Sequence, residues 1–358
     1  MKVETLLPFG KADSGLKAGQ TLLDVRTVSA EAARVEALGY DGLAIQDNQD
    51  DPYIIGALAA QGTKRIHIAT SVAIAFPRSP TVTAMTAWTL AKLSGGRFVL
   101  GLGSQVKGHI ERRFGMKWHA PGPWMRDYLQ AVRALWDSWQ NGTPVDHQSG
   151  HYRINLNVPL FMPAPLDCPL PKIELAAVNP YMSRVAGEVA DGLRAHPVCT
   201  VEYIEQVMMP AVRKGAAIAG RKLDAFTVCI KPLIATAPDE ATLAERVKEI
   251  RGRIAFYGST PAYAAAFEVH GLTDLAAELN KLSREQRWAE MAALVSDDVL
   301  EKYAVVGTYE TIVDRIVARY GGHVTHLEFS IPVRGPADEQ TLAGMVAKLQ
   351  AVPLPKVG

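Results

Sequence analysis

Three side chains that can move protons follow short apolar segments of the chain. Asp47 comes directly after DGLAIQ, His196 lies within GLRAHPV, and His109 comes shortly after GRFVLGLG. Carboxylates and imidazoles are common general acids and bases in enzymes, and the imidazole of histidine titrates near neutral pH. Asp47, His109 and His196 are therefore the candidate catalytic residues.

Each of these three residues also has a purely structural interpretation. Asp47 stands close to Asp50 and Asp51, so it can be a solvated carboxylate in an acidic loop. His109 can be a surface residue at the start of a helix. His196 points toward the same side of the molecule as the other candidates only if the side chains of its strand alternate regularly.

Two turns between a strand and a helix can hold an anion with their backbone N–H groups. The first consists of Gly103, Ser104, Gln105 and Val106. The second consists of Ala177, Val178, Asn179 and Ser183. Such turns are also glycine-rich for steric reasons alone, but two of them at successive strand ends fit one phosphate held from two sides. A dinucleotide-binding GxGxxG pattern is excluded, because the third glycine falls too late after the first two.

The segment IHIATSVAIAFPRSP changes its character abruptly. It begins as a buried strand, reaches the hydroxyl pair Thr70-Ser71, and becomes small and apolar again from Val72. It contains neither Gly nor Asn to form an ordinary turn. The segment is therefore either a buried strand with a polar end or a place where the backbone at Ser71-Val72 is irregular.

The elements that must position these residues alternate between short apolar strands and amphipathic helices. The expected strands are 3–7, 41–46, 65–70, 96–103, 172–178, 192–198, 226–237 and 326–333. Eight strands, each followed by a helix, predict the α/β class and a TIM (β/α)8 barrel, whose chemistry lies where the strands end. A doubly wound sheet with a helical appendage is the alternative. We expect a single barrel domain over 1–358, with a loop insertion at 142–171 and a helical insertion at 239–322 between strands seven and eight.

The composition of the chain excludes several classes of partner. Among 358 residues, 38 are Lys or Arg and 37 are Asp or Glu, so no basic excess indicates nucleic acid. No apolar stretch is long enough for a membrane span, and the first residues lack the apolar core of a signal peptide. Cys168, Cys199 and Cys229 are widely spaced, which predicts free thiols, a cytoplasmic location and no metal site.

Several motifs resemble one protein family. LSGGRFVLGLGSQVKGHIERRFG and MRDYLQAVRALW are similar to segments of the luciferase-like flavin and deazaflavin oxidoreductases. The similarity includes ALGYDGLAIQD before them and AAVNPYMSRVAGEVADG after them, and it extends from near the start of the chain to the eighth strand. The segment GSQVKGHIERRFG is most similar to the corresponding segment of the members that use the deazaflavin coenzyme F420.

The resemblance implies a cofactor and the residues that hold it. The cofactor would be coenzyme F420, with FMN as the alternative. In this family the third strand often ends in a non-prolyl cis peptide bond against which the ring packs, and by position this bond would be Ser71-Val72. The implied cofactor-binding residues are Asp47, Asn48, Thr70, Ser71, Val72 and Ala73, with the two turns described above for the phosphate.

The resemblance also implies a function. An F420-dependent oxidoreductase would transfer a hydride between the deazaflavin and a small organic substrate such as a carbonyl, an imine or an activated alkene. The alternatives are an FMN-dependent luciferase-like monooxygenase and a non-catalytic deazaflavin-binding protein. Asn48 stands where some relatives carry a ring-contacting His, and Val106 stands where sugar-phosphate dehydrogenases carry a proton-donating Glu. We further expect a small-molecule substrate and a homodimer or higher homo-oligomer.

Overall fold

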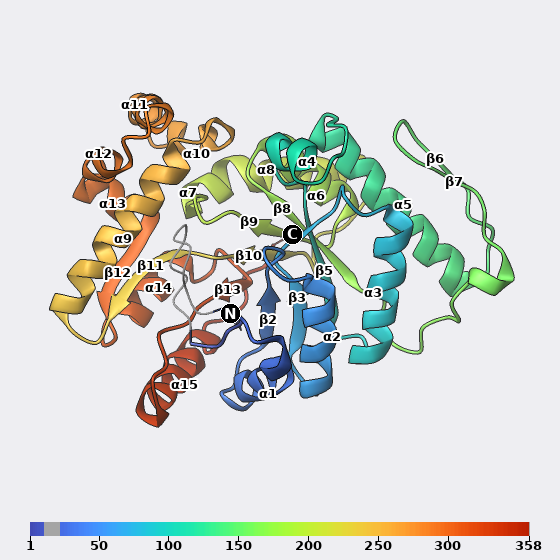
Figure 1. The fold of residues 1–358 in the computed structure, drawn as a ribbon, viewed down its shortest axis with the longest axis horizontal. Coiled ribbons are helices and arrows are strands. Elements are labelled where there is room, and N and C mark those ends of the chain that lie inside the picture. The colour runs from blue at the N-terminus through green and yellow to red at the C-terminus, as the bar shows by residue number, and fades with distance from the viewer. Residues whose placement is uncertain (11–21, 358) are drawn as a thin grey trace.

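The computed structural model describes residues 1–10 and 22–357 of the chain. Within these residues, eight parallel strands form a ring with helices around it (Figure 1). In spatial order they are β1 (Lys2–Thr5), β2 (Gly42–Ile45), β3 (His67–Thr70), β5 (Phe98–Gly103), β8 (Lys172–Ala177), β9 (Gly192–Ala195), β10 (Thr227–Ile230) and β13 (His326–Glu328). The ring is closed because β13 pairs with both β1 and β10, and β3 pairs with β5. The predicted TIM barrel is therefore confirmed.

Helices between successive strands cover the outside of the barrel. They are α1 (Val28–Ala37), α2 (Pro52–Gly62), α3 (Pro80–Ser94), α4 (Lys107–Arg112), α5 (Pro121–Asn141), α6 (Pro180–Val189), α7 (Val201–Tyr203), α8 (Met209–Ile218), α14 (Ile312–Tyr320) and α15 (Pro336–Gln350). Two of their starts have a clear local cause: the side chains of Asp51 and Ser79 accept hydrogen bonds from the first turns of α2 and α3, and a proline follows each cap. None of the described helices is long and apolar enough to cross a membrane.

The segment predicted as the seventh strand is two strands, and the prediction of one strand over 226–237 was wrong. β10 belongs to the barrel, whereas β11 (Leu233–Ala237) leaves it and pairs in parallel with β12 (Ala304–Thr308). Pro232 lies between β10 and β11, and a proline has no N–H group with which to continue a ladder. The apolar pattern is similar on both sides of this proline, so hydrophobicity alone does not reveal the break.

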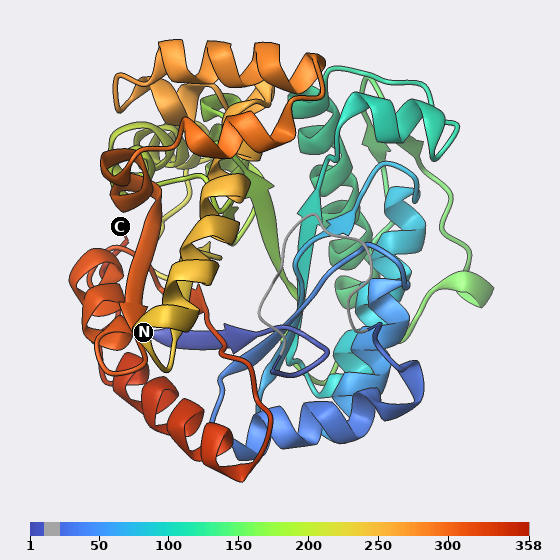
Figure 2. The same ribbon diagram turned by 60° about the vertical axis from the view of Figure 1, so that its left-hand side comes forward.

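The insertion at 239–322 is consequently a mixed α/β segment and not a purely helical one. It contains β12 and, besides α14, the helices α9 (Glu240–Gly258), α10 (Ala265–Glu268), α11 (Thr273–Arg284), α12 (Trp288–Ala293) and α13 (Asp297–Tyr303). These helices gather at one side of the barrel, and α9 packs against the β11–β12 pair (Figure 1, Figure 2). The smaller insertion at 142–171 holds the hairpin of β6 (His147–Gln148) and β7 (Arg153–Ile154).

Charged side chains fill part of the barrel interior. The guanidinium of Arg194 donates to both carboxylate oxygens of Glu4, at 2.9 and 3.0 Å. Its Nε lies 2.6 Å from Oε2 of Glu174, as an ion pair outside hydrogen-bond geometry. Glu4 also contacts Nε2 of His67 at 2.6 Å. Gly101 beside this network allows β3 to approach closely, since a Cβ there would lie only 1.8 Å from the carbonyl oxygen of Thr70.

Glu4 and Arg194 stay ionised inside the barrel. Burial alone would raise the pKa of Glu4, but Arg194 and His67 hold that pKa well below its ordinary value. Burial alone would lower the pKa of Arg194, but Glu174 and Glu4 hold it well above its ordinary value. Because each charge is buried against an opposite one, the loss of a single partner would leave an uncompensated buried charge.

Candidate functional site at the barrel mouth

The irregular backbone predicted after the third strand is present. The peptide bond between Ser71 and Val72 is cis, as expected. β3 ends at Thr70, whose hydroxyl donates to the carbonyl of Gly101 at 2.6 Å. The chain resumes as β4 (Ala73–Ile74), which pairs with the end of β5. The bulge therefore lies at the barrel mouth and is held to β5 on both sides of the cis bond.

Gly103 makes a close contact with this bulge possible. A Cβ added to Gly103 would lie only 2.6 Å from Cγ2 of Val72. Ala73 is fully buried beside it, and Ala177 is buried at the end of the adjacent β8. The strand ends here thus present small side chains to the mouth of the barrel, as a flat group packed against them would require.

The two predicted anion turns lie side by side. β5 and β8 are neighbours in the barrel, and their register places residues 103–106 beside residues 177–179. Gln105 has a φ of 55°, in the left-handed region, which turns the chain between β5 and α4. α6 starts directly after Asn179, whose side chain does not cap it but donates to the carbonyl of Ala262 at 3.1 Å. Ser183 is buried and donates from its hydroxyl to the carbonyl of Asn179.

Asp47 holds the bulge in place. Its Oδ2 accepts a hydrogen bond from the backbone N–H of Ile74 at 2.9 Å and one from Arg78 at 2.8 Å. Arg78 also pairs with Asp51 at 2.9 Å, so the two carboxylates share one guanidinium. The alternative of a solvated loop carboxylate does not describe Asp47, because its side chain is only 8 % exposed. This geometry fits a residue that positions β4.

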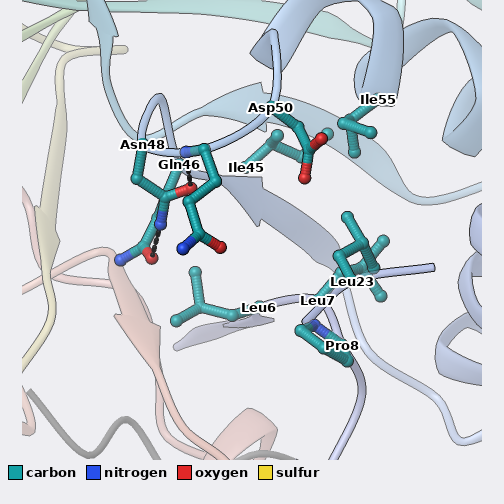
Figure 3. A pocket seen from close by; sticks show the side chains of 10 residues that line it. Leu6, Leu7, Pro8, Leu23, Ile45, Gln46, Asn48, Asp50 and Ile55 are labelled. Carbon is teal, nitrogen blue, oxygen red and sulfur yellow. Dashed lines mark hydrogen bonds between the residues drawn. The ribbon is translucent and has the colours of Figure 1, made fainter. Parts of the chain in front are cut away.

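A hollow lies between the ends of β1 and β2 (Figure 3). Gln46 and Asn48 contribute their amide side chains to its wall, and Leu6 lies below them in this view. The amide of Asn48 donates to Oε1 of Gln46 at 3.3 Å. Arg113, which follows α4, donates to the carbonyl of Asn48 at 3.0 Å, so the segment after β5 reaches the loop after β2.

A second hollow lies between the ends of β1, β10 and β13 and the insertion. Leu6 lines both hollows, so they adjoin at the end of β1. The charged side chains that line the second hollow are Lys231, Arg246, Arg253 and Glu328. Two of these come from barrel strands or their ends, and two come from α9.

The chain matches known proteins over most of its length. Residues 1–326 match the family model described as luciferase-like monooxygenase. The chain belongs to this luciferase-like family. An uncharacterized protein of Mycobacterium tuberculosis is 40 % identical over 293 residues, which is 82 % of this chain and 86 % of the relative. A 5,10-methylenetetrahydromethanopterin reductase of Archaeoglobus fulgidus is 27 % identical over 318 residues, covering 86 % of this chain and 90 % of that protein.

A solved structure supports the fold of this luciferase-like protein. The coenzyme F420-dependent tetrahydromethanopterin reductase of Methanopyrus kandleri superposes with a TM-score of 0.71, at 20 % sequence identity. The match covers 98 % of this chain and 97 % of that structure. The luciferase-like barrel is thus preserved along almost the whole chain, and the family's known members are oxidoreductases and monooxygenases.

His196 of the luciferase-like protein lies at the mouth, but as a neutral imidazole. Its ring contacts those of Tyr257 and Tyr263 from the insertion, at centroid distances of 4.7 and 4.3 Å. Nδ1 accepts a hydrogen bond from the backbone N–H of Val198 at 3.3 Å, which leaves Nε2 as the protonated nitrogen. Burial, with the nearby cations of Arg253 and Lys231, lowers the pKa of His196 to about 3. The imidazole therefore serves as a hydrogen-bond donor and not as an acid near neutral pH.

The pKa of His196 gives a pH dependence of stability. Between its ordinary pKa of 6.5 and about 3, the unfolded chain binds a proton at His196 that the folded chain does not. The contribution of neutral His196 to the free energy of unfolding is therefore complete above pH 6.5 and is lost as the pH falls. We expect the free energy of unfolding to fall by up to about 1.4 kcal/mol per pH unit below 6.5 for this group. Urea unfolding at several pH values should show that the free energy of unfolding of His196→Asn depends less steeply on pH than that of wild type. An identical pH dependence would contradict the low pKa.

His109 lies on α4, a six-residue helix that follows β5, and its side chain is exposed. Val106, at the start of the same helix, is also exposed, at 44 %. The interpretation of His109 as a surface residue at the start of a helix therefore fits its position in this luciferase-like protein.

Sequence reasoning missed Arg194, which connects the barrel interior to the bulge. Besides Glu4 and Glu174, its guanidinium contacts Oγ of Ser71 at 3.3 Å. The signal that could have identified this group is a charged residue inside each of three mainly apolar strands: Glu4 in VETLL, Glu174 in KIELAA and Arg194 in GLRAH. Glu4, His67 and His326 also lie within reach of one metal ion. Arg194 already supplies a cation to both oxygens of Glu4, so we assign no metal there, and the absence of a metal site stays a prediction.

Proposed function

We propose that this luciferase-like protein is a coenzyme F420-dependent oxidoreductase that transfers a hydride between the deazaflavin and a small organic substrate. The observation that carries the proposal is the convergence of the bulge at residues 70–73 with Gly103 and Ala177 at one side of the barrel mouth. The names of the relatives in Archaeoglobus and Methanopyrus, both tetrahydromethanopterin reductases, support a reductase. The second of these names specifies coenzyme F420.

The residues present fit such a cofactor. Gly103 lets the side chain of Val72 in the bulge pack directly against the end of β5, and a flat ring would rest against this bulge. Residues 103–106 and the start of α6 would hold the phosphate, because backbone N–H groups and the helix dipole at such turns favour an anion. Asn48 and Gln46 would meet the polar edge of the ring with their amides.

The chain's own residues would orient and shield the reaction. When bound, a deazaflavin supplies the carbon that gives or takes a hydride. Asp47 and Arg78 would keep the bulge fixed behind the ring through Ile74. His196 would donate a hydrogen bond from Nε2, and Tyr257 and Tyr263 would exclude water beside it. Carbonyls, imines and activated alkenes are the substrate groups that suit hydride transfer at such a site.

The family model's own description, luciferase-like monooxygenase, favours one rival, and this rival would use FMN. Oxygen uptake separates the two functions. With reduced FMN and candidate substrates we expect no oxygen uptake above that of free reduced FMN, and with reduced F420 we expect reduction of a substrate. Substrate-dependent oxygen uptake with FMN would overturn the proposal. Tight F420 binding without turnover of any carbonyl, imine or alkene would instead favour the non-catalytic alternative.

The two histidines at and near the mouth give a test of the proton transfer. Asn keeps a hydrogen-bond donor but cannot be protonated, so His196→Asn should keep kcat within about threefold of wild type with an unchanged pH profile. General acid catalysis contributes about 10²- to 10⁴-fold. His109→Ala serves as the exposed control and should also have little effect. A loss of kcat of about 100-fold in either variant, with one limb of the pH profile missing, would identify that histidine as the proton donor.

We also infer a homo-oligomer, most simply a homodimer, in the cytoplasm. Neighbouring helices α2 and α3 expose Ile54, Val82 and Met85, at 60, 53 and 49 %. Exposed apolar side chains on adjacent elements favour association. The three cysteines are free, which fits a reducing compartment. Light scattering during gel filtration tests the oligomer, and a monomeric mass at micromolar concentration would contradict it.

A further inference from the structure

We infer that the segment that follows β7, residues 155–166, is an arm that packs on helices α2 and α3 of a second copy of the chain. The inference rests on the homo-oligomer proposed above and names the part of the chain that holds it together. Each copy would place its arm on the helices of the other, around a two-fold axis. This exchange would cover the arm and the helix face at the same time.

The arm exposes large apolar side chains to solvent. They lie within six residues, around a single helical turn, Pro159–Phe161. The exposed fractions are 79 % for Leu156, 37 % for Val158, 85 % for Leu160 and 72 % for Phe161. Leu160 and Leu156 are the two most exposed large apolar residues in the part of the chain that the structure describes. Isolated exposed apolar residues are common, but a cluster of this kind is typical of a surface that binds another molecule.

The absence of charge favours a second copy as the partner. The arm has no charged residue between Arg153 and Asp167. The eleven residues of α2 include none, and α3 has only Lys92. An interface around a two-fold axis repeats every charge on both sides, so uncharged surfaces fit such an interface without repulsion. A lipid surface would instead attract lysine and arginine side chains, which the arm lacks.

Contacts to α5 and α3 hold the arm at the outside of the barrel. Asn157 donates from its side chain to Oγ of Ser138 on α5 at 2.8 Å. Nε1 of Trp88 on α3 donates to the carbonyl of Ala164 at 3.2 Å. The exposed turn lies between these two anchors. Figure 1 shows the β6–β7 hairpin at the edge of the molecule beyond α5, and in Figure 2 the green segment that follows it projects from the outer surface.

The helices that would receive the arm present an apolar face. Val82, Met85 and Leu93 lie on the outward side of α3 at helical spacing, and all three are exposed. Ile54 on α2 extends this face, since α2 packs beside α3. The arm is anchored to the same helix α3 through Trp88. The arm and the helix face are therefore close enough for one two-fold interface to bury both.

The base of the arm is fixed to the barrel mouth. Nδ1 of His151 lies 2.6 Å from Oδ2 of Asp127, and Nε1 of Trp124 donates to the hydroxyl of Tyr152 at 2.7 Å. The ring of Trp124 stacks on Phe76, which follows β4, at a centroid distance of 3.6 Å. A segment that is already ordered loses little conformational entropy on association, so the arm is suited to a stable interface.

Sedimentation velocity over a series of protein concentrations tests the inference by measuring the dissociation constant of the oligomer. The double variant Leu160→Ser with Phe161→Ser should raise this constant about 100-fold or more, because two apolar side chains would no longer be buried. Met85→Ser, on the receiving face, should raise it about tenfold. Ile218→Ser is the matched control, since Ile218 is 57 % exposed on α8, and it should leave the constant unchanged.

Photo-cross-linking locates the arm on its partner. A photoreactive benzoylphenylalanine takes the place of Phe161, and the variant is irradiated in an equal mixture of unlabelled and heavy-isotope-labelled protein. Mass spectrometry then identifies the linked peptides. We expect pairs of mixed label that join the arm to α2 or α3. Such pairs can form only between two copies of the chain.

The outcomes separate the arm from the other proposals. A wild-type protein that is monomeric at micromolar concentration would overturn both the oligomer and the arm. An oligomer that the double variant leaves intact, an equal weakening by Ile218→Ser, or cross-links confined to one label would overturn the arm alone. F420 fluorescence in the same samples reports the cofactor proposal separately: if F420 fails to bind while the double variant still dissociates the oligomer, the cofactor proposal fails and the arm stands.

Discussion

We expect the substitution Arg194→Met to lower the free energy of unfolding by about 3–5 kcal/mol near neutral pH, the usual cost of leaving a buried charge unpaired. Met has a similar volume, so the cost comes from Glu4 and Glu174, which lose their shared guanidinium inside the barrel. Urea unfolding followed by circular dichroism measures the change. The same variant loses the contact to Ser71, so its affinity for the cofactor should also fall.

The pH dependence separates this electrostatic cause from a packing defect. Without Arg194, the pKa of Glu4 would be raised, and acid would neutralise this carboxylate. The deficit of Arg194→Met relative to wild type should therefore shrink as the pH is lowered toward 5. The triple replacement Glu4→Gln, Glu174→Gln and Arg194→Met is the control, and it should be more stable than Arg194→Met alone. A deficit that is constant with pH would show that packing, and not charge, is responsible.

The substitution Gly103→Ala should weaken cofactor binding about 100-fold, or about 2.7 kcal/mol. A Cβ at this position would lie 2.6 Å from Cγ2 of Val72, closer than real Cβ contacts allow, so the bulge must move. The far-ultraviolet circular dichroism should stay that of a folded barrel, because the strain falls at the mouth and not in the ring of strands. Quenching of F420 fluorescence measures the affinity.

The double variant Gly103→Ala with Val72→Ala is the matched control for this prediction. Removing Cγ2 of Val72 restores the space, so the double variant should recover at least about tenfold of the lost affinity. Val72→Ala alone should change the affinity by less than Gly103→Ala does. Additive effects of the two substitutions would mean that the contact between residues 72 and 103 does not shape the cofactor site.

The barrel could be predicted from the sequence because its signals are local and repeated. Apolar strands alternate with amphipathic helices, and caps such as Asp51 and Ser79 mark the helix starts. The β11–β12 pair could not be predicted in this way. Its partners lie far apart in the chain, and the only sign of the break was Pro232 within an apolar run. Pairing between distant segments leaves no periodic mark in either of them.

The candidate site could be predicted where a backbone feature has a residue signature. The change at Thr70-Ser71-Val72 indicated the bulge, and the small residues at 103 and 177 indicated a close approach. The roles of ionisable side chains were harder to predict, because they depend on neighbours from other elements. Asp47 meets Arg78, and His196 meets two tyrosines of the insertion.

Equilibrium titration with the two cofactors tests the central proposal most directly. Purified protein freed of bound cofactor is titrated separately with oxidised F420 and with FMN, and binding is followed by fluorescence. We predict saturable binding of F420 at one site per chain, at least about tenfold tighter than that of FMN, and its loss in Gly103→Ala. Tighter binding of FMN, or F420 binding that Gly103→Ala leaves unchanged, would contradict the assignment of this barrel mouth to a deazaflavin.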